Sequence, residues 1–165
     1  MTPLLLDVPK LIVWRLDRAI FATTWDSGEG ASLLGGRWSS KGVVAVYCSV
    51  DPATSILEVA VNHGFHRLDT TAYVLTAVAI DEPTAIRVVM PAEISNAHWL
   101  HPGTPSAGQQ SFGDRLLAEH GFVAFPSVVS AHSWNLVFVP GAGGYSQHLQ
   151  EDFALDTRLH PPISG

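Results

Sequence analysis

The sequence predicts one α+β domain, with a compact mixed or antiparallel sheet and few helices. Its 165 residues fall within the usual size of a single domain, so we expect residues 1–165 to fold as one unit. Apolar residues make up 47% of the chain and charged residues only 15%, which favours a packed core over disorder. Short apolar runs do not alternate regularly with helical segments, so a doubly wound parallel sheet is not expected.

Three apolar runs in the first half of the chain predict strands, because they are rich in β-branched and aromatic residues. They cover residues 11–16, 43–50 and 71–80. Residues 17–34 are of mixed character with glycines typical of a loop, and residues 35–42 contain Gly-Gly-Arg-Trp. Both of these segments are therefore expected to be loops.

One well-marked helix is predicted over residues 53–63. Asp51 can cap the free N–H groups of its first turn, Pro52 is tolerated at the first helical position, and Gly64 suits its C-terminal end. At helical spacing, one face carries Ile56, Leu57, Ala60 and Val61, and the opposite face carries Thr54, Ser55, Glu58 and Asn62. We expect the first of these faces to be the buried one.

The second half of the chain predicts further short strands around one more helix. The strands are expected at residues 85–90, 122–125 and 134–139, with a last edge strand at 152–159. The helix is expected over residues 112–120, ending at Gly121. Residues 91–110 are expected to be a long loop with a turn of helix near 93–100, and residues 141–150 a second loop.

The charge and cysteine content narrow the function. The net charge is −6 and no Lys/Arg cluster is present, which disfavours direct binding of nucleic acid. A single cysteine excludes an intrachain disulfide and fits a reducing cytoplasm. Residues 1–10 lack the pattern of a signal peptide, and no apolar run approaches the ~20 residues of a membrane helix. We expect a cytoplasmic protein that does not bind membranes, with a sparsely charged surface that leaves room for a partner or a homodimer.

Two arginines are candidate anion ligands. Arg37 follows Gly35 and Gly36, which allow close approach of a ligand to the main chain. Arg15 interrupts an apolar strand, where a structural salt bridge, for instance to Glu58, is the alternative to a ligand contact. Planar guanidinium donors suit phosphate oxygens, so the residues predict a pocket for a phosphate-bearing ligand. Neither the G-x-G-x-x-G fingerprint nor a Walker A loop is present.

Three other side chains are candidates for the same pocket. Glu58 is the single acid of a nearly uncharged helix, with a solvent-exposed surface position as the alternative. Tyr47 is either a core residue or a ring that stacks on a flat ligand such as a nicotinamide. Ser127 follows Pro126 without a G-x-S-x-G elbow, which excludes a serine-hydrolase nucleophile and leaves a turn or a ligand hydrogen bond.

The histidines and the cysteine are weaker candidates. His63/His66 and His98/His101 have spacings that can chelate a metal, but no third ligand stands out and HExxH is absent. No metal site is therefore predicted, and a metal-dependent hydrolase is the weakest of the alternatives. Cys48 is expected to be a packed thiol, because no catalytic-cysteine signature surrounds it.

Several segments, in this order, resemble the RES domain family, the toxin components of RES–Xre type II toxin–antitoxin systems. These segments are Trp14-Arg15-Leu16, Gly36-Arg37-Trp38 with Gly42, Val46-Tyr47, Ile56-Leu57-Glu58-Val59-Ala60-Val61, Pro126-Ser127-Val128-Val129, Asn135-Leu136-Val137-Phe138 and Glu151-Asp152-Phe153 to Arg158-Leu159. Together they cover nearly the whole chain. One departure is Val139-Pro140, where the family often has Asn-Pro.

The resemblance implies an ADP-ribosyltransferase-like fold and cleavage of the nicotinamide–ribose bond of NAD⁺, which is then a substrate, with no prosthetic group. The implied catalytic residues are Glu58, Arg15 and Tyr47, and the implied NAD⁺-binding residues are Arg15, Arg37, Tyr47, Ser127 and Asn135. Glu58 would stabilise the oxocarbenium-like transition state, and the two arginines would hold the pyrophosphate. Tyr47 would stack on nicotinamide or ribose.

The resemblance also implies a partner and a consequence for the cell. Loss of NAD⁺ would arrest growth, and an Xre-type helix-turn-helix antitoxin would block the active site and bind DNA itself. The acceptor stays open between water (an NAD⁺ glycohydrolase), phosphate (a phosphorylase) and a protein side chain (an ADP-ribosyltransferase). A catalytically silent module that only binds an Xre-type partner is the alternative from another class.

Overall fold

The computed structural model describes residues 1–101, 103–141 and 143–155. Its strands are β1 (Leu11–Arg18), β2 (Val46–Ser49), β3 (Tyr73–Ile80), β4 (Arg87–Val88), β5 (Phe122–Pro126), β6 (Trp134–Phe138) and β7 (Tyr145–Phe153). They form one seven-stranded sheet in the order β4-β5-β6-β2-β1-β3-β7. Neighbouring strands are antiparallel except β4 and β5, which are parallel. The predicted mixed, largely antiparallel sheet is confirmed.

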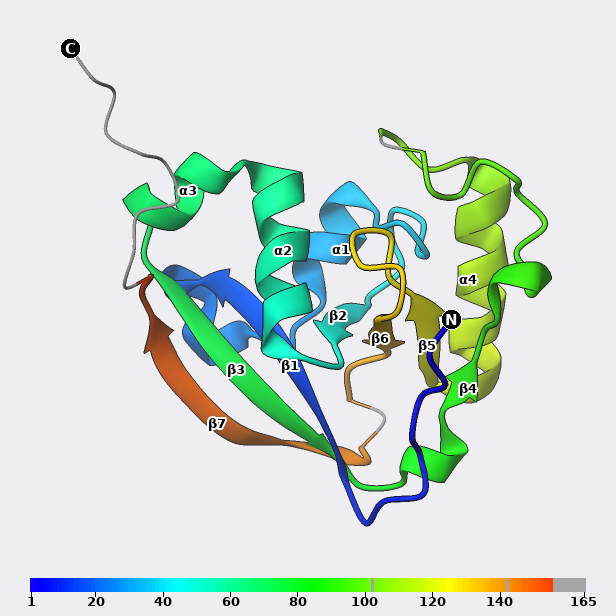
Figure 1. The fold of residues 1–165 in the computed structure, drawn as a ribbon, viewed down its shortest axis with the longest axis horizontal. Coiled ribbons are helices and arrows are strands. Elements are labelled where there is room, and N and C mark those ends of the chain that lie inside the picture. Colours follow the sequence, from blue (N-terminus) through cyan, green and yellow to red (C-terminus); the bar gives the residue numbers. More distant parts are fainter. Residues whose placement is uncertain (102, 142, 156–165) are drawn as a thin grey trace.

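The helices flank this sheet at two places. The α-helices are α1 (Glu29–Leu34), α2 (Pro52–His63), α3 (Phe65–Thr70) and α4 (Ala107–His120), and the 3₁₀ helices are η1 (Ala19–Thr24), η2 (Pro83–Ala85) and η3 (Pro91–Glu93). Helix α2 packs on β1 and β2, whereas α4 packs on β5 nearer the other edge of the sheet (Figure 1). The turn after β5 lies between these two helices in the same view.

The loop after Arg37 is part of the hydrophobic core. Trp38 is only 1% exposed, and its ring stacks on Phe125 of β5 at 4.4 Å between centroids. Helix α4 closes over the same loop at Gly113, where a Cβ atom would lie 2.0 Å from the Trp38 carbonyl oxygen. Glycine is therefore required there for the helix and the loop to pack together. The loop next to Arg37 is therefore packed between β5 on one side and α4 on the other.

Helix α2 begins and ends as its sequence predicts, but the predicted burial of its two faces is confirmed only in part, since Ala60 is buried and Asn62 exposed as expected. Asp51 accepts a hydrogen bond from Thr54 N at 2.7 Å, and Pro52 occupies the first turn. Thr54 and Ser55, assigned to the outer face, are buried, whereas Val61 is 57% exposed. Thr54 tolerates burial because its hydroxyl is hydrogen-bonded to the Asp51 carboxylate.

Several other boundaries differ from expectation. The segment 17–34, expected to be a loop, contains η1 and α1, and most of the loop expected at 141–150 belongs to β7. Residues 65–70 form α3, which was not predicted. Strand β2 is shorter than 43–50, β4 is shorter than 85–90, and α4 begins at Ala107 because Ser106 caps it. The expected edge strand at 152–159 is displaced: β7 ends at Phe153, and residues 156–159 lie outside the described part of the chain. Within the described residues, no helix has the length and apolar character needed to cross a membrane.

Candidate functional site

The Glu58 carboxylate is anchored at one of its two oxygens. From α2 it accepts a hydrogen bond at Oε1 from the Ser127 hydroxyl, at 3.0 Å, and a second at the same oxygen from Asn135 Nδ2. Among the described residues, Oε2 has no hydrogen-bond partner. Two residues about 70 to 80 positions further along the chain therefore hold this carboxylate and leave one of its oxygens available.

A tight turn after β5 orients Ser127. Its hydroxyl oxygen accepts hydrogen bonds from the main-chain N–H groups of Val129 and Ser130, each at 3.2 Å. Its own N–H donates to the carbonyl of Ser133, and the residue is 3% exposed. With its lone pairs engaged, the hydroxyl proton is directed at Glu58. Of the two alternatives for Ser127, the turn is present, and the hydrogen bond to a ligand stays a prediction.

Asn135 lies at the centre of a row of residues that crosses the sheet. In the strand register it is opposite Ser49 of β2 on one side and Phe125 of β5 on the other. Its Oδ1 accepts a hydrogen bond from the Ser49 hydroxyl at 2.8 Å, and its Nδ2 donates to Glu58. The amide thus connects the sheet to helix α2.

The hydroxyl of Tyr47 is hydrogen-bonded to the Gly-Gly-Arg-Trp loop. Its phenol oxygen accepts a hydrogen bond from Trp38 N at 3.1 Å and lies 2.8 Å from the Ser39 hydroxyl. Gly36 permits this approach, since a Cβ atom there would lie 2.2 Å from the Tyr47 hydroxyl. Burial raises the pKa of Tyr47 above its ordinary value, so the phenol is neutral near pH 7.

Arg37 is partly desolvated and has no carboxylate partner. Its Nη1 donates to the carbonyl of Trp99 at 2.7 Å and makes a longer contact of 3.5 Å with that of His101. Among the described residues, no Asp or Glu forms an ion pair with it. Burial lowers the pKa of Arg37 from its ordinary value, and the charge of Glu58 opposes that shift. Its remaining donors suit an anion close to Glu58.

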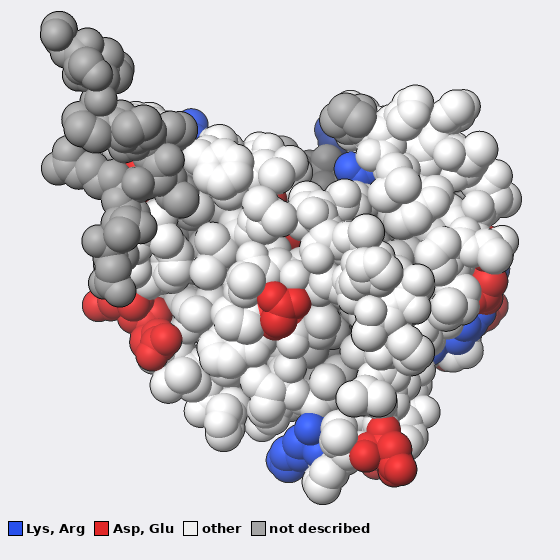
Figure 2. Space-filling view, in the orientation of Figure 1, with Lys and Arg blue, Asp and Glu red and all other residues white. Residues whose placement is uncertain are grey.

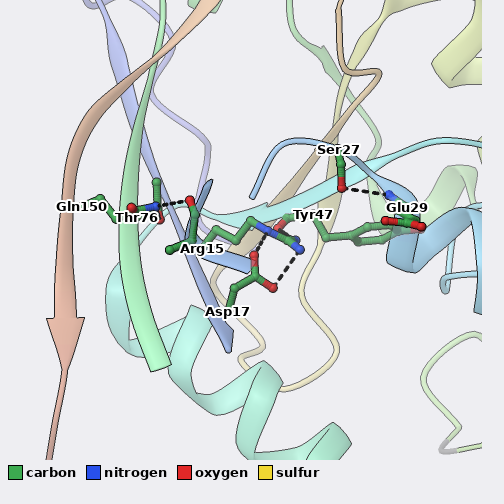
Figure 3. A network of polar contacts seen from close by, with 8 residues as sticks. Arg15, Asp17, Ser27, Glu29, Tyr47, Thr76 and Gln150 are labelled. Carbon is green, nitrogen blue, oxygen red and sulfur yellow. Dashed lines mark hydrogen bonds and ion pairs between the residues drawn. The ribbon is translucent and has the colours of Figure 1, made fainter. Parts of the chain in front are cut away.

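Arg15 forms its contacts with Asp17 and with the backbone of Tyr47 (Figure 3). Its guanidinium forms a two-pronged ion pair with Asp17, with Nη2 to Oδ1 at 2.9 Å, and its Nη1 donates to the main-chain carbonyl of Tyr47 at 2.8 Å. The structural salt bridge expected as one alternative is present, but its partner is Asp17 and not Glu58. Arg15 therefore contacts the site through the backbone of Tyr47.

Two residues of this arrangement were not predicted, Ser49 and Asp17. Ser49 follows Tyr47 by two positions on β2, so the period of a strand places both side chains on one face. A small polar residue on the same strand face as Tyr47 is the sequence feature that would have indicated Ser49 as part of the site. Asp17 stands two residues after Arg15 on β1, and the same period would have indicated the pair.

The surface around the site is sparsely charged. Figure 2 shows a largely uncharged face whose upper edge is indented between the α2–α3 side and the α4 side, with Lys or Arg atoms at the indentation. A separate cavity of about 280 Å³ lies between residues 94–96 and the first turns of α4. Gln109, which lines that cavity, donates to the carbonyl of Arg37 at 3.4 Å, so the cavity adjoins the back of the loop and not Glu58.

The metal and thiol candidates do not form sites. In the described part of the chain, no three His, Cys, Asp or Glu side chains gather closely enough to hold a metal ion. The rings of His98 and His101 lie 4.7 Å apart as a tilted pair. Cys48 is buried among core side chains, which confirms the packed thiol predicted for it.

The fold and the comparisons define the class of this protein and then its family. The class is an α+β domain with one largely antiparallel seven-stranded sheet and few helices, as predicted. The family model described as RES domain matches residues 12–157. The chain belongs to the RES domain family, as its sequence motifs indicate.

Two relatives extend along nearly the whole chain. One is the protein named Toxin Res from Photorhabdus laumondii subsp. laumondii, which is 28% identical over 155 residues that cover 90% of this chain and 97% of that protein. The other is a chain in the crystal structure of the M. tuberculosis MbcT-MbcA toxin-antitoxin complex, with a TM-score of 0.63 and 18% identity. The match covers 88% of this chain and 85% of that chain. At that identity the structural likeness speaks for the fold alone.

Proposed function

We propose that this chain is the toxin of a toxin–antitoxin pair and that it cleaves the nicotinamide–ribose bond of NAD⁺. Membership of the RES domain family and the relative named Toxin Res support the toxin assignment. The solved neighbour is part of a toxin–antitoxin complex, which supports an antitoxin as partner. The chain's net charge of −6 agrees with a partner of Xre type that carries the DNA-binding helix-turn-helix.

The observation that carries the proposed reaction is the one-sided anchoring of Glu58. Nicotinamide leaves NAD⁺ as a neutral molecule, and positive charge develops on the ribose as the bond breaks. A fixed carboxylate stabilises charge that appears only in the transition state, which lowers the barrier. Ser127 and Asn135 hold Oε1. In this proposal Oε2 is the oxygen that meets the ribose, and it needs no reorganisation to do so.

Arg37 is the better placed of the two arginines to hold the pyrophosphate. It is half buried, and the charge of Glu58 acts on its guanidinium. Among the described residues, only its Nη1 is used in hydrogen bonds to the protein, so other N–H groups can donate to a ligand. Charge-assisted hydrogen bonds of this kind contribute ~1.5–3 kcal/mol each. The charge of Arg15 is balanced by Asp17, so in this proposal Arg15 supports Tyr47 and does not grip phosphate alone. In the same proposal, the ring of Tyr47 stacks against the nicotinamide half of NAD⁺.

Measurement of NAD⁺ in cells tests the reaction. Expression of the wild-type chain is expected to deplete NAD⁺, and Glu58→Gln is expected to reduce turnover by the purified protein by ~10²–10³. Glu119→Gln on α4, whose side chain is 56% exposed, is the matched control and retains full turnover. Undiminished NAD⁺ during expression of folded wild-type protein would overturn the proposal and favour the silent binding module.

The products identify the acceptor. In phosphate-free buffer a glycohydrolase yields nicotinamide and ADP-ribose, whereas added phosphate diverts a phosphorylase to a phosphorylated ADP-ribose. Transfer to protein appears as a label that stays with macromolecules. Of these, water and phosphate are the acceptors we propose, because the same Glu58 step serves both and neither needs a surface for a target protein.

A further inference from the structure

We propose that Ser49 is a positioning residue whose hydroxyl sets the orientation of the Asn135 amide and, through it, of the Glu58 carboxylate. Ser49 is 3% exposed and donates to Asn135 Oδ1 at 2.8 Å. Asn135 in turn donates from Nδ2 to Glu58 Oε1. A directed chain of donors therefore starts in the sheet and ends on the carboxylate. Its effect on catalysis rests on the proposed function, but its effect on the amide does not.

The strand register explains why these two side chains meet. Val50 N donates to the carbonyl of Trp134 at 3.0 Å, which makes that pair a hydrogen-bonded one. In an antiparallel ladder the next pair, Ser49 and Asn135, is then of the non-hydrogen-bonded kind, in which the Cα atoms lie about 4.5 Å apart and side chains are close. The contact is thus a product of backbone pairing and needs no flexible loop.

The chemistry of the amide makes the direction of this chain important. A carboxylate can only accept hydrogen bonds, so the amide must present its NH₂ group, and its oxygen must face the opposite way. Without the Ser49 hydroxyl, that oxygen would lose its donor in a partly buried setting, which disfavours the same orientation. A donor at the oxygen also polarises the amide and strengthens its N–H bond to Glu58.

Ser49 has a matched control within the same sheet. Thr76 on β3 is 1% exposed, and its hydroxyl accepts a hydrogen bond at 3.0 Å from the Gln150 amide, directly opposite on β7. Both pairs join a buried strand hydroxyl to a cross-strand amide. Thr76 and Gln150 form no hydrogen bond with Glu58 among the described residues, so loss of the Thr76 hydroxyl tests for a merely structural effect.

The experiment compares Ser49→Ala with Thr76→Val in the full-length protein. For Ser49→Ala, we expect kcat for NAD⁺ consumption to fall about 3- to 10-fold with KM within twofold, the equivalent of one hydrogen bond. In ¹⁵N-labelled protein, the side-chain NH₂ signals of Asn135 should shift and exchange faster with water. Thr76→Val should leave kcat and the Asn135 signals unchanged.

The two readouts separate the possible failures. If the wild-type protein does not consume NAD⁺, the proposed function fails, but the Asn135 signals still decide whether Ser49 orients the amide. Unchanged Asn135 signals in Ser49→Ala overturn the positioning role. So does a fall in kcat of the same size in Thr76→Val, because the effect would then belong to strand hydroxyls in general.

Discussion

Arg15 donates to the carbonyl oxygen of Tyr47 at the place where β1 and β2 separate. The register joins these strands at Trp14 and Ser49, with no further described pair toward Tyr47. On the β6 side Tyr47 occupies a non-hydrogen-bonded position opposite Val137, so its carbonyl points toward β1. The guanidinium of Arg15 therefore supplies the donor that a continued ladder would have provided.

Loss of Arg15 is expected to destabilise the fold and not only the site. Arg15→Ala leaves the Tyr47 carbonyl without this donor and Asp17, whose side chain is 17% exposed, without its ion pair. We expect the free energy of unfolding to fall by about 1–3 kcal/mol, measured by urea denaturation. In the double variant, Asp17→Ala should cost less than it does alone, because its partner is already absent. Additive effects would contradict the pairing.

Gly36 is expected to admit no side chain. A Cβ atom there would meet the Tyr47 hydroxyl at 2.2 Å, so Gly36→Ala forces the loop or the phenol to move. Overpacking of this kind costs about 1–3 kcal/mol, and we expect lower stability together with lower NAD⁺ turnover. Gly108→Ala on α4 is the control, since no atom lies within 4 Å of its Cβ position. It should raise stability by up to about 1 kcal/mol, as alanine does in helices.

The Asp51 carboxylate is expected to stabilise the fold in a pH-dependent way. Burial raises its pKa, but hydrogen bonds from Thr54 and Ser133 outweigh this and hold the pKa below the ordinary value of 3.8. A carboxyl group with a lowered folded pKa contributes fully above its unfolded pKa, and the contribution disappears as the pH falls through the folded value.

The matching experiment uses Asp51→Asn, which keeps a capping side chain without the charge. Its urea midpoint should lie below that of the wild type at pH 7, and the two midpoints should converge below about pH 4. A difference that is constant from pH 7 to pH 3 would show that the charge of Asp51 has no part in the effect.

Cys48 is expected to be unreactive in the folded protein. Burial raises the pKa of its thiol to about 12, and the residue is 3% exposed. Only a negligible thiolate fraction is then available at pH 8. A disulfide reagent should therefore detect no thiol in the native protein and one thiol in guanidinium chloride. Rapid reaction of the native protein would show that β2 opens.

Local signals in the sequence predict the elements whose ends carry capping chemistry or whose cores are apolar. Asp51, Pro52 and Gly64 define helix α2 to within one residue. Strand β7 escaped prediction because its residues 146–152 are mostly polar and exposed, as suits an edge strand, and lack apolar alternation. Thr54 was assigned to the wrong face because its burial depends on Asp51 and Ser133, which the helical period cannot reveal.

Sequence motifs indicate which residues belong to the candidate site, but they do not indicate how those residues contact one another. The motifs indicate Glu58, Ser127 and Asn135, and the structure joins them by direct hydrogen bonds. Their connections depend on strand register, which is set by pairings far apart in the chain. For that reason neither Ser49 as the neighbour of Asn135 nor Asp17 as the partner of Arg15 was foreseen.

The packing of Trp38 between Phe125 and Gly113 has a genetic consequence. Because this tryptophan is a core residue and also the neighbour of Arg37, the loop cannot be displaced without disturbing the fold. If expression of the chain arrests growth, colonies that escape arrest will carry mutations at these packing positions as well as at Glu58. The target for loss of toxicity is then much larger than the set of polar side chains proposed to bind the ligand.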